Sequence, residues 1–216
     1  LEDINFADLG DLELGFGAAK PAIEAVREAT QKILSAGSIP FMLGGEHSLT
    51  AGAFAAVKQA HPDVSLVQLD AHADLRLEYL GDPDSHACVM QRCLELGCAL
   101  YQFGIRSGTA DEWRRMRSDQ TLYHWDDLAE VLGSIKGPVY LTVDIDVFDP
   151  SVVPGTGTPE PGGIMWGQFE SALAAIAASS MEIVGLDLME LSPQLDSSGV
   201  SSVVAAKCAR ELLLLI

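Results

Sequence analysis

One short motif, Asp70-Ala71-His72-Ala73-Asp74, constrains this chain more than any other stretch. It directly follows the apolar run 64–69, which is typical of a buried strand. If the chain stays extended, alternate residues project to one side, so two carboxylates and one imidazole share one spot. Such a group is unfavourable in a hydrophobic core and well suited to binding a metal ion. We therefore expect a metal site just past the end of this strand.

Two further apolar runs end in side chains of the same kind. The run 139–143 leads into Asp144-Ile145-Asp146, and the run 39–43 leads into Gly44-Gly45-Glu46-His47. In open α/β sheets, ligands bind at the carboxyl ends of the strands. Four carboxylates at one place would repel one another unless divalent cations neutralised them. We therefore expect two metal ions, held by His47, Asp70, His72, Asp74, Asp144 and Asp146.

Apolar strands alternate with helical segments along the whole chain. Strands are expected at 39–43, 64–70, 98–104, 121–123, 139–144 and 182–188, and helices at about 18–36, 48–60, 86–96, 110–118, 126–133, 166–178 and 199–215. Helices of this length can cross over between parallel strands, which predicts a mostly parallel α/β sheet covered on both faces. The 216 residues fit one domain, 1–216, and contain no internal repeat.

The charge balance limits the class of partner. The chain carries 13 basic and 31 acidic residues, a net charge of −18, which argues against nucleic acid and anionic membranes as partners. The same excess is compatible with a cationic substrate or with metal ions, although solubility alone explains it equally well. The chain has four cysteines without a Cys-x-x-Cys pair, and it shows neither an apolar run of membrane-spanning length nor a secretory signal. We therefore expect reduced thiols and a cytoplasmic location.

Two loops are candidates for the walls of a binding site. The polar loop 75–85 follows the central motif, and the Pro- and Gly-rich segment 149–163 follows the Asp144/Asp146 pair. Glu190 lies at the carboxyl end of the strand 182–188, as the expected metal ligands do at theirs. His86 opens a helix just after the first loop, a position that on its own is more often a surface helix start than a catalytic site.

Taken together, these motifs resemble those of the ureohydrolase family, which contains the arginases and agmatinases. The resemblance rests on Gly44-Gly45-Glu46-His47-Ser48, Asp70-Ala71-His72-Ala73-Asp74, Ser85-His86-Ala87 and Asp144-Ile145-Asp146. It covers nearly the whole chain and implies a three-layer α/β/α fold. The agmatinase form of the segment 155–163, and Leu75-Arg76 where arginases place an Asn, make the chain most similar to agmatinases. Relatives carry an N-terminal strand and further segments before the helix at 18–36, which we expect this chain to lack.

The resemblance also implies a binuclear manganese centre with a role for each ligand. His47 and Asp74 would hold one Mn²⁺, His72 and Asp146 the other, and Asp70 and Asp144 would bridge them. A water activated by the two ions would attack the guanidinium carbon of agmatine and release putrescine and urea, a step of polyamine biosynthesis.

The remaining candidate site residues have expected roles as well. His86 would give a proton to the leaving amine, and Glu190 would accept hydrogen bonds from the guanidinium, with Asp74 also taking part in catalysis. Glu160 and the loop 75–85 are candidates for contact with the ammonium end of the substrate. A homo-oligomer, a trimer or a hexamer, is the assembly that the family implies.

Two alternatives remain open. A related amidinohydrolase could use the same centre on guanidinobutyrate, arginine or another guanidino compound, and other divalent ions suit the same ligands. A non-catalytic metal-binding protein is the second alternative, but every expected ligand and catalytic residue is present in the sequence.

Overall fold

Six strands form one sheet in the order β1-β6-β5-β2-β3-β4, and every neighbouring pair is parallel. The computed structural model that gives this arrangement describes residues 5–15 and 17–216. The strands are β1 (Phe41–Leu43), β2 (Ser65–Leu69), β3 (Leu100–Phe103), β4 (Leu122–Tyr123), β5 (Gly137–Asp144) and β6 (Met181–Met189). The predicted parallel sheet is confirmed, and its two central strands, β5 and β2, are those that precede the carboxylate motifs.

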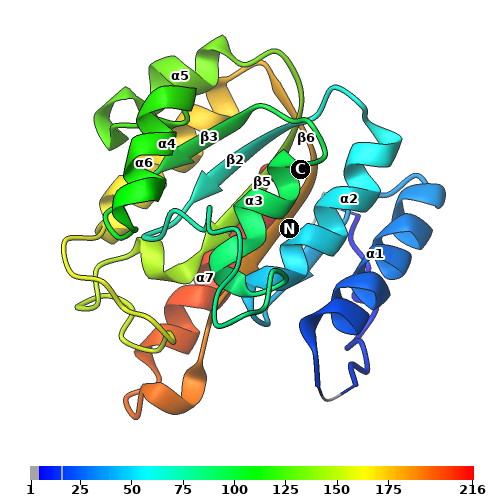
Figure 1. Ribbon diagram of the computed structural model, residues 1–216, viewed down its shortest axis with the longest axis horizontal. Coiled ribbons are helices and arrows are strands. Elements are labelled where there is room, and N and C mark those ends of the chain that lie inside the picture. The colour runs from blue at the N-terminus through cyan, green and yellow to red at the C-terminus, as the bar shows by residue number, and fades with distance from the viewer. Residues whose placement is uncertain (1–4, 16) are drawn as a thin grey trace.

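Helices cover both faces of the sheet, which makes the predicted three-layer fold (Figure 1). Within the described residues they are α1 (Ala19–Ser35), α2 (Thr50–Ala60), α3 (Val89–Leu94), α4 (Ala110–Asp119), α5 (Leu128–Ser134), α6 (Trp166–Ala178) and α7 (Val200–Leu213). Helices α1 to α4 pack on one face, and α5 to α7 pack on the other. The expected helices are all present, but three of them begin with a separate 3-10 turn, at His47–Leu49, His86–Cys88 and Trp125–Asp127.

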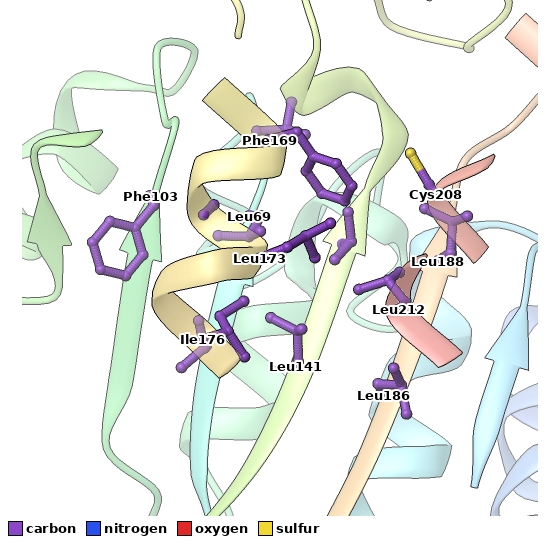
Figure 2. Close-up of a cluster of buried hydrophobic side chains, with 14 of the residues drawn as sticks. Leu69, Phe103, Leu141, Phe169, Leu173, Ile176, Leu186, Leu188, Cys208 and Leu212 are labelled. Atoms are coloured by element: carbon purple, nitrogen blue, oxygen red, sulfur yellow. The ribbon is translucent and has the colours of Figure 1, made fainter. Parts of the chain in front are cut away.

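The larger apolar cluster lies between the sheet and helices α5 to α7. Figure 2 shows Phe169, Leu173 and Ile176 of α6 over the strands, with Leu212 of α7 nearby. These three α6 residues recur at helical spacing, so one face of the helix is apolar and faces the sheet. Burying a side chain of this size contributes about 1.5–3 kcal/mol, so this layer fixes α6 firmly against β5 and its neighbours.

On the opposite face, helices α1 and α2 approach each other closely at a glycine. A Cβ atom added to Gly52 of α2 would lie 2.1 Å from the carbonyl oxygen of Ile23 in α1. Only a residue without a side chain therefore fits this contact. Since α2 begins just after His47, the packing of α1 on α2 also holds the start of α2 beside the sheet edge.

Some features lie outside the sheet and its covering helices. Residues 5–15 are exposed and form no helix or strand. Cys88, Cys93, Cys98 and Cys208 are free thiols. None of the helices in the described part of the chain combines the length and the apolar character needed to cross a membrane.

Candidate metal centre and substrate pocket

The two central strands deliver carboxylates to the same point of the sheet edge. Leu69 of β2 pairs with Val143 of β5, so the residues that follow them, Asp70 and Asp144, lie next to each other. His47 reaches this point from the turn after β1. Its Nδ1 atom lies 3.2 Å from Asp70 Oδ2, 3.4 Å from Asp74 Oδ2 and 3.1 Å from Asp144 Oδ2. One imidazole nitrogen therefore faces three carboxylates.

A second group of ligand atoms lies beside the first and shares Asp70 with it. His72 Nδ1 lies 2.9 Å from Asp146 Oδ2 and 3.7 Å from Asp70 Oδ1. The two oxygens of Asp70 thus face different imidazoles. Potential ligand atoms of His47, Asp70 and Asp144 lie within 4.8 Å of one another, as do those of Asp70, His72 and Asp146. This arrangement could hold two metal ions side by side.

The prediction that the whole motif 70–74 is extended is wrong at Asp74. Asp74 does not continue an extended segment but has a left-handed backbone, with φ of 52°. Its carbonyl oxygen accepts hydrogen bonds from the amides of Met90 and Gln91 at the start of α3. The chain therefore turns at Asp74 to meet α3, and the turn still leaves its carboxylate 3.4 Å from His47.

Two atoms of the cluster show that the residues fit metal ions. His47 Nδ1 and Asp146 Oδ2 are buried and form no hydrogen bond. Leaving such an atom unpaired costs about 1–3 kcal/mol, and a bound cation would remove that cost for both. Carboxylate oxygens with two imidazole nitrogens are a donor set that divalent transition metals accept. The residues present therefore fit a binuclear metal site.

Crowding of the carboxylates changes their protonation. Burial, followed by the charge of Asp70, raises the pKa of Asp74 to about 7. Burial and neighbouring carboxylates also raise the pKa values of Asp144 and Asp146. For His72, burial lowers the pKa, but Asp146 and Asp70 outweigh it and raise that pKa to about 11. The metal-free cluster therefore holds protons that a metal ion would have to displace.

A cavity of about 440 Å³ opens above the cluster and includes the other predicted site residues. His86, Glu160 and Glu190 line it together with His47 and His72. Glu190 Oε1 accepts a hydrogen bond from the amide of His47 at 2.6 Å, and Glu190 has a left-handed backbone with φ of 65°. Glu160 Oε1 lies 3.9 Å from His72 Nε2. The structure therefore brings all nine predicted residues to one cavity and its floor.

Glu46 holds His86 at the wall of this cavity. Glu46 Oε1 accepts a hydrogen bond from the amide of His86 at 3.2 Å and lies 3.5 Å from its Nδ1. The side-chain contact with Glu46 raises the pKa of His86, and burial opposes that rise only in part. The ring of Tyr79 packs edge-on against the imidazole. Glu46 lies within the Gly44-Gly45-Glu46-His47 motif, but its contact with His86 was not predicted from the sequence.

Arg106 is a second residue of the site that was not predicted from the sequence. Its guanidinium donates hydrogen bonds to the carbonyl oxygens of Asp146 and Glu160, each at 2.7 Å. It thereby joins the turn after β5 to the loop that carries Glu160. Its position after β3, in Gly104-Ile105-Arg106, was the available signal, because that is again the carboxyl end of a strand.

Comparison with known proteins adds to this geometry. The sequence matches the model of the arginase family over residues 1–215. It is 41% identical over 221 residues to an agmatinase of Bacillus anthracis, covering 99% of this chain and 76% of that protein. It is 39% identical over 203 residues to an N(1)-aminopropylagmatine ureohydrolase of Thermococcus kodakarensis, covering 88% and 67%. A crystal structure from Clostridium difficile, of a protein assigned as an agmatinase, matches with a TM-score of 0.96 and 41% identity, covering 100% and 81%.

Proposed function

The chain belongs to the arginase family and is a ureohydrolase, and we propose that it hydrolyses the guanidino group of agmatine to putrescine and urea. The observation that carries the proposal is the pair of His/Asp groups that share Asp70 at the floor of the cavity. Agmatinase relatives that match 99% of the chain support the choice of agmatine. An acidic cavity also suits a substrate with two cationic ends.

The metal in this proposal is manganese, with two ions per chain. His47 and Asp74 would hold one ion, His72 and Asp146 the other, and Asp70 and Asp144 would contact both. One oxygen of Asp70 faces His47 and the other faces His72, which supports a role for Asp70 in binding both ions. When bound, such ions lower the pKa of a coordinated water, which supplies a nucleophile near neutral pH.

Side chains in the cavity would orient the substrate and move the proton. The carboxylate of Glu190 would accept hydrogen bonds from the guanidinium, and the amide of His47 keeps that carboxylate in place. His86 would give its proton to the nitrogen that leaves as the amine of putrescine, because Glu46 favours its protonated form. Glu160 is the candidate partner for the far ammonium, since it is a further carboxylate that lines the same cavity.

Urea release from a substrate panel tests the function. The panel is agmatine, arginine, guanidinobutyrate and N(1)-aminopropylagmatine, each assayed with Mn²⁺. We expect urea chiefly from agmatine, and a raised KM for agmatine in Glu190→Gln, which weakens the guanidinium contact. Urea from another member alone would keep the centre and change the substrate. No urea from any member, in a protein shown to bind Mn²⁺, would refute the proposal.

The assembly and location belong to the same proposal. We expect a homo-oligomer, a trimer or a hexamer, and a cytoplasmic location, on the support of the family resemblance and the reduced thiols. Light scattering on the purified protein would test the oligomer, and a monomer would contradict it.

A further inference from the structure

Polar side chains form a row inside the sheet, just before the metal centre. Four neighbouring strands contribute one residue each: Asp187 in β6, Thr142 in β5, Gln68 in β2 and Gln102 in β3. Strand pairing aligns them, because Thr142 lies opposite both Asp187 and Gln68, and Gln68 lies opposite Gln102. All four have 0% exposure. We call these four residues the polar row. Buried polar groups cost free energy unless they are hydrogen-bonded, so each residue of the row is expected to have a hydrogen-bond partner.

Gln68 of the polar row contacts the carboxylate that both metal groups share. Its Nε2 donates a hydrogen bond to Asp70 Oδ2 at 2.7 Å and to the carbonyl oxygen of His72 at 3.1 Å. Gln102 Nε2 in turn donates to Gln68 Oε1 at 2.7 Å, and Thr121 donates to Gln102 Oε1 at 2.7 Å. This series fixes the Gln68 amide with its NH₂ group toward Asp70.

Thr142 of the polar row contacts His47, on the nitrogen away from the metal centre. His47 Nε2 lies 2.8 Å from Thr142 Oγ1, while Nδ1 faces the carboxylates. Binding of a metal ion through Nδ1 requires that the ring proton sit on Nε2. That proton can then be donated to the hydroxyl oxygen of Thr142, so this contact selects the imidazole form that binds a metal.

Asp187 completes this side of the row. A threonine hydroxyl that accepts from His47 has its own proton to donate, and Asp187 lies opposite Thr142 across the strand pair. Asp187 Oδ1 is buried and has no hydrogen-bond partner, whereas Oδ2 accepts from Thr50 at 2.8 Å and from Tyr140 at 2.7 Å. The free oxygen is thus available to the Thr142 hydroxyl.

We propose that the polar row is a positioning network for metal binding, in which Thr142 presents His47 and Gln68 presents Asp70. Asp187 and Gln102 orient these two residues from behind. The inference rests on the proposed metal centre but goes beyond it, because it assigns a role to residues that touch neither metal nor substrate. Partners of this kind change metal affinity by about 10–100-fold in known sites.

Affinity for Mn²⁺ in threonine variants tests the row. Thr142→Val removes the hydroxyl with little change of shape, and Thr142→Ser retains it. Titration calorimetry on the metal-free protein should give a dissociation constant about 10–100-fold higher for Thr142→Val, and one near that of the wild type for Thr142→Ser. The matched control is Thr30→Val, the same substitution at a buried threonine of α1 whose hydroxyl donates to the carbonyl oxygen of Val26, outside the polar row, and it should leave the affinity unchanged. Gln68→Met should weaken both ions and serves as the second variant if Thr142→Val does not fold.

Each outcome decides between positioning and a merely structural role. Unchanged affinity in folded Thr142→Val and Gln68→Met would overturn the inference while leaving the metal centre intact. Equal weakening in Thr142→Val, Thr142→Ser and Thr30→Val would also overturn it, because a general loss of stability would then be the cause. Failure of the wild type to bind Mn²⁺ would instead refute the proposed centre itself, and the row's role with it.

Discussion

Added Mn²⁺ should raise the melting temperature of the metal-free protein strongly. The four carboxylates of the cluster are 0–7% exposed, so the site exists only in the folded chain and the ions stabilise that state alone. At a free concentration 100 times the dissociation constant, each ion contributes about 2.7 kcal/mol, or roughly 5 kcal/mol for two. For a chain of this size, that corresponds to a rise of about 10–20 °C, measured by differential scanning calorimetry.

Substitution of single carboxylates should reduce this rise in melting temperature by an amount that depends on how many ions the carboxylate contacts. Asp146 belongs to only one of the two groups, so Asp146→Asn should keep about half of the rise, whereas Asp70 is shared and Asp70→Asn should abolish nearly all of it. Asp63 is exposed and precedes β2, at the opposite end of that strand from Asp70. It gives the matched control Asp63→Asn, which should keep the full rise. A full rise in Asp70→Asn would refute the reasoning, because the ions would then bind elsewhere on this acidic chain.

Three more substitutions test separate features. His86→Asn should lower kcat about 10²–10⁴-fold with little change in KM, and an unchanged kcat would exclude His86 as the proton donor. In urea titrations, Gly52→Ala should destabilise the fold by about 1–3 kcal/mol, because the added Cβ meets α1. Gly167→Ala adds a Cβ into open space and should stabilise the fold by about 0.4–1 kcal/mol. Equal effects of the two substitutions would contradict the packing argument. Hydrogen bonds from Ser151 and Gly162 lower the pKa of Asp149 to about 2, so the stability advantage of the wild type over Asp149→Asn should be full above pH 4 and shrink as the pH falls toward 2. An advantage independent of pH in the same titrations would show that the charge of Asp149 is not involved.

The sheet and the ligand positions could be predicted because their signals are local. Strands buried on both faces have continuous apolar sequences, and β2 and β5 end directly before their carboxylates. Parallel strands bring those ends to one edge, so the convergence of Asp70 and Asp144 follows from two short stretches of sequence. The left-handed turn at Asp74 does not follow, since it depends on where α3 packs.

The supporting residues could not be predicted because their meaning depends on register. Gln68 and Thr142 each lie within a mostly apolar run, where nothing distinguishes them from any other polar residue of a strand. They become a row only when strands distant in the sequence pair at one level. Arg106 likewise finds most of its acceptors 40 to 55 residues away, where no local pattern indicates them.

The left-handed backbone conformations of Asp74 and Glu190 lower the thermal stability of the protein at two residues of its proposed site. Glycine and asparagine adopt this conformation at lower cost than glutamate, and such strain is of order 1–3 kcal/mol per residue. A library screened for thermal survival in a chelating buffer should therefore enrich glycine at Glu190, because the screen does not reward catalysis and the relief of strain is set against one hydrogen bond from the His47 amide. The variants that survive best would be those that have lost the guanidinium contact. Directed evolution of a more thermostable enzyme from this chain thus requires that turnover be selected together with stability.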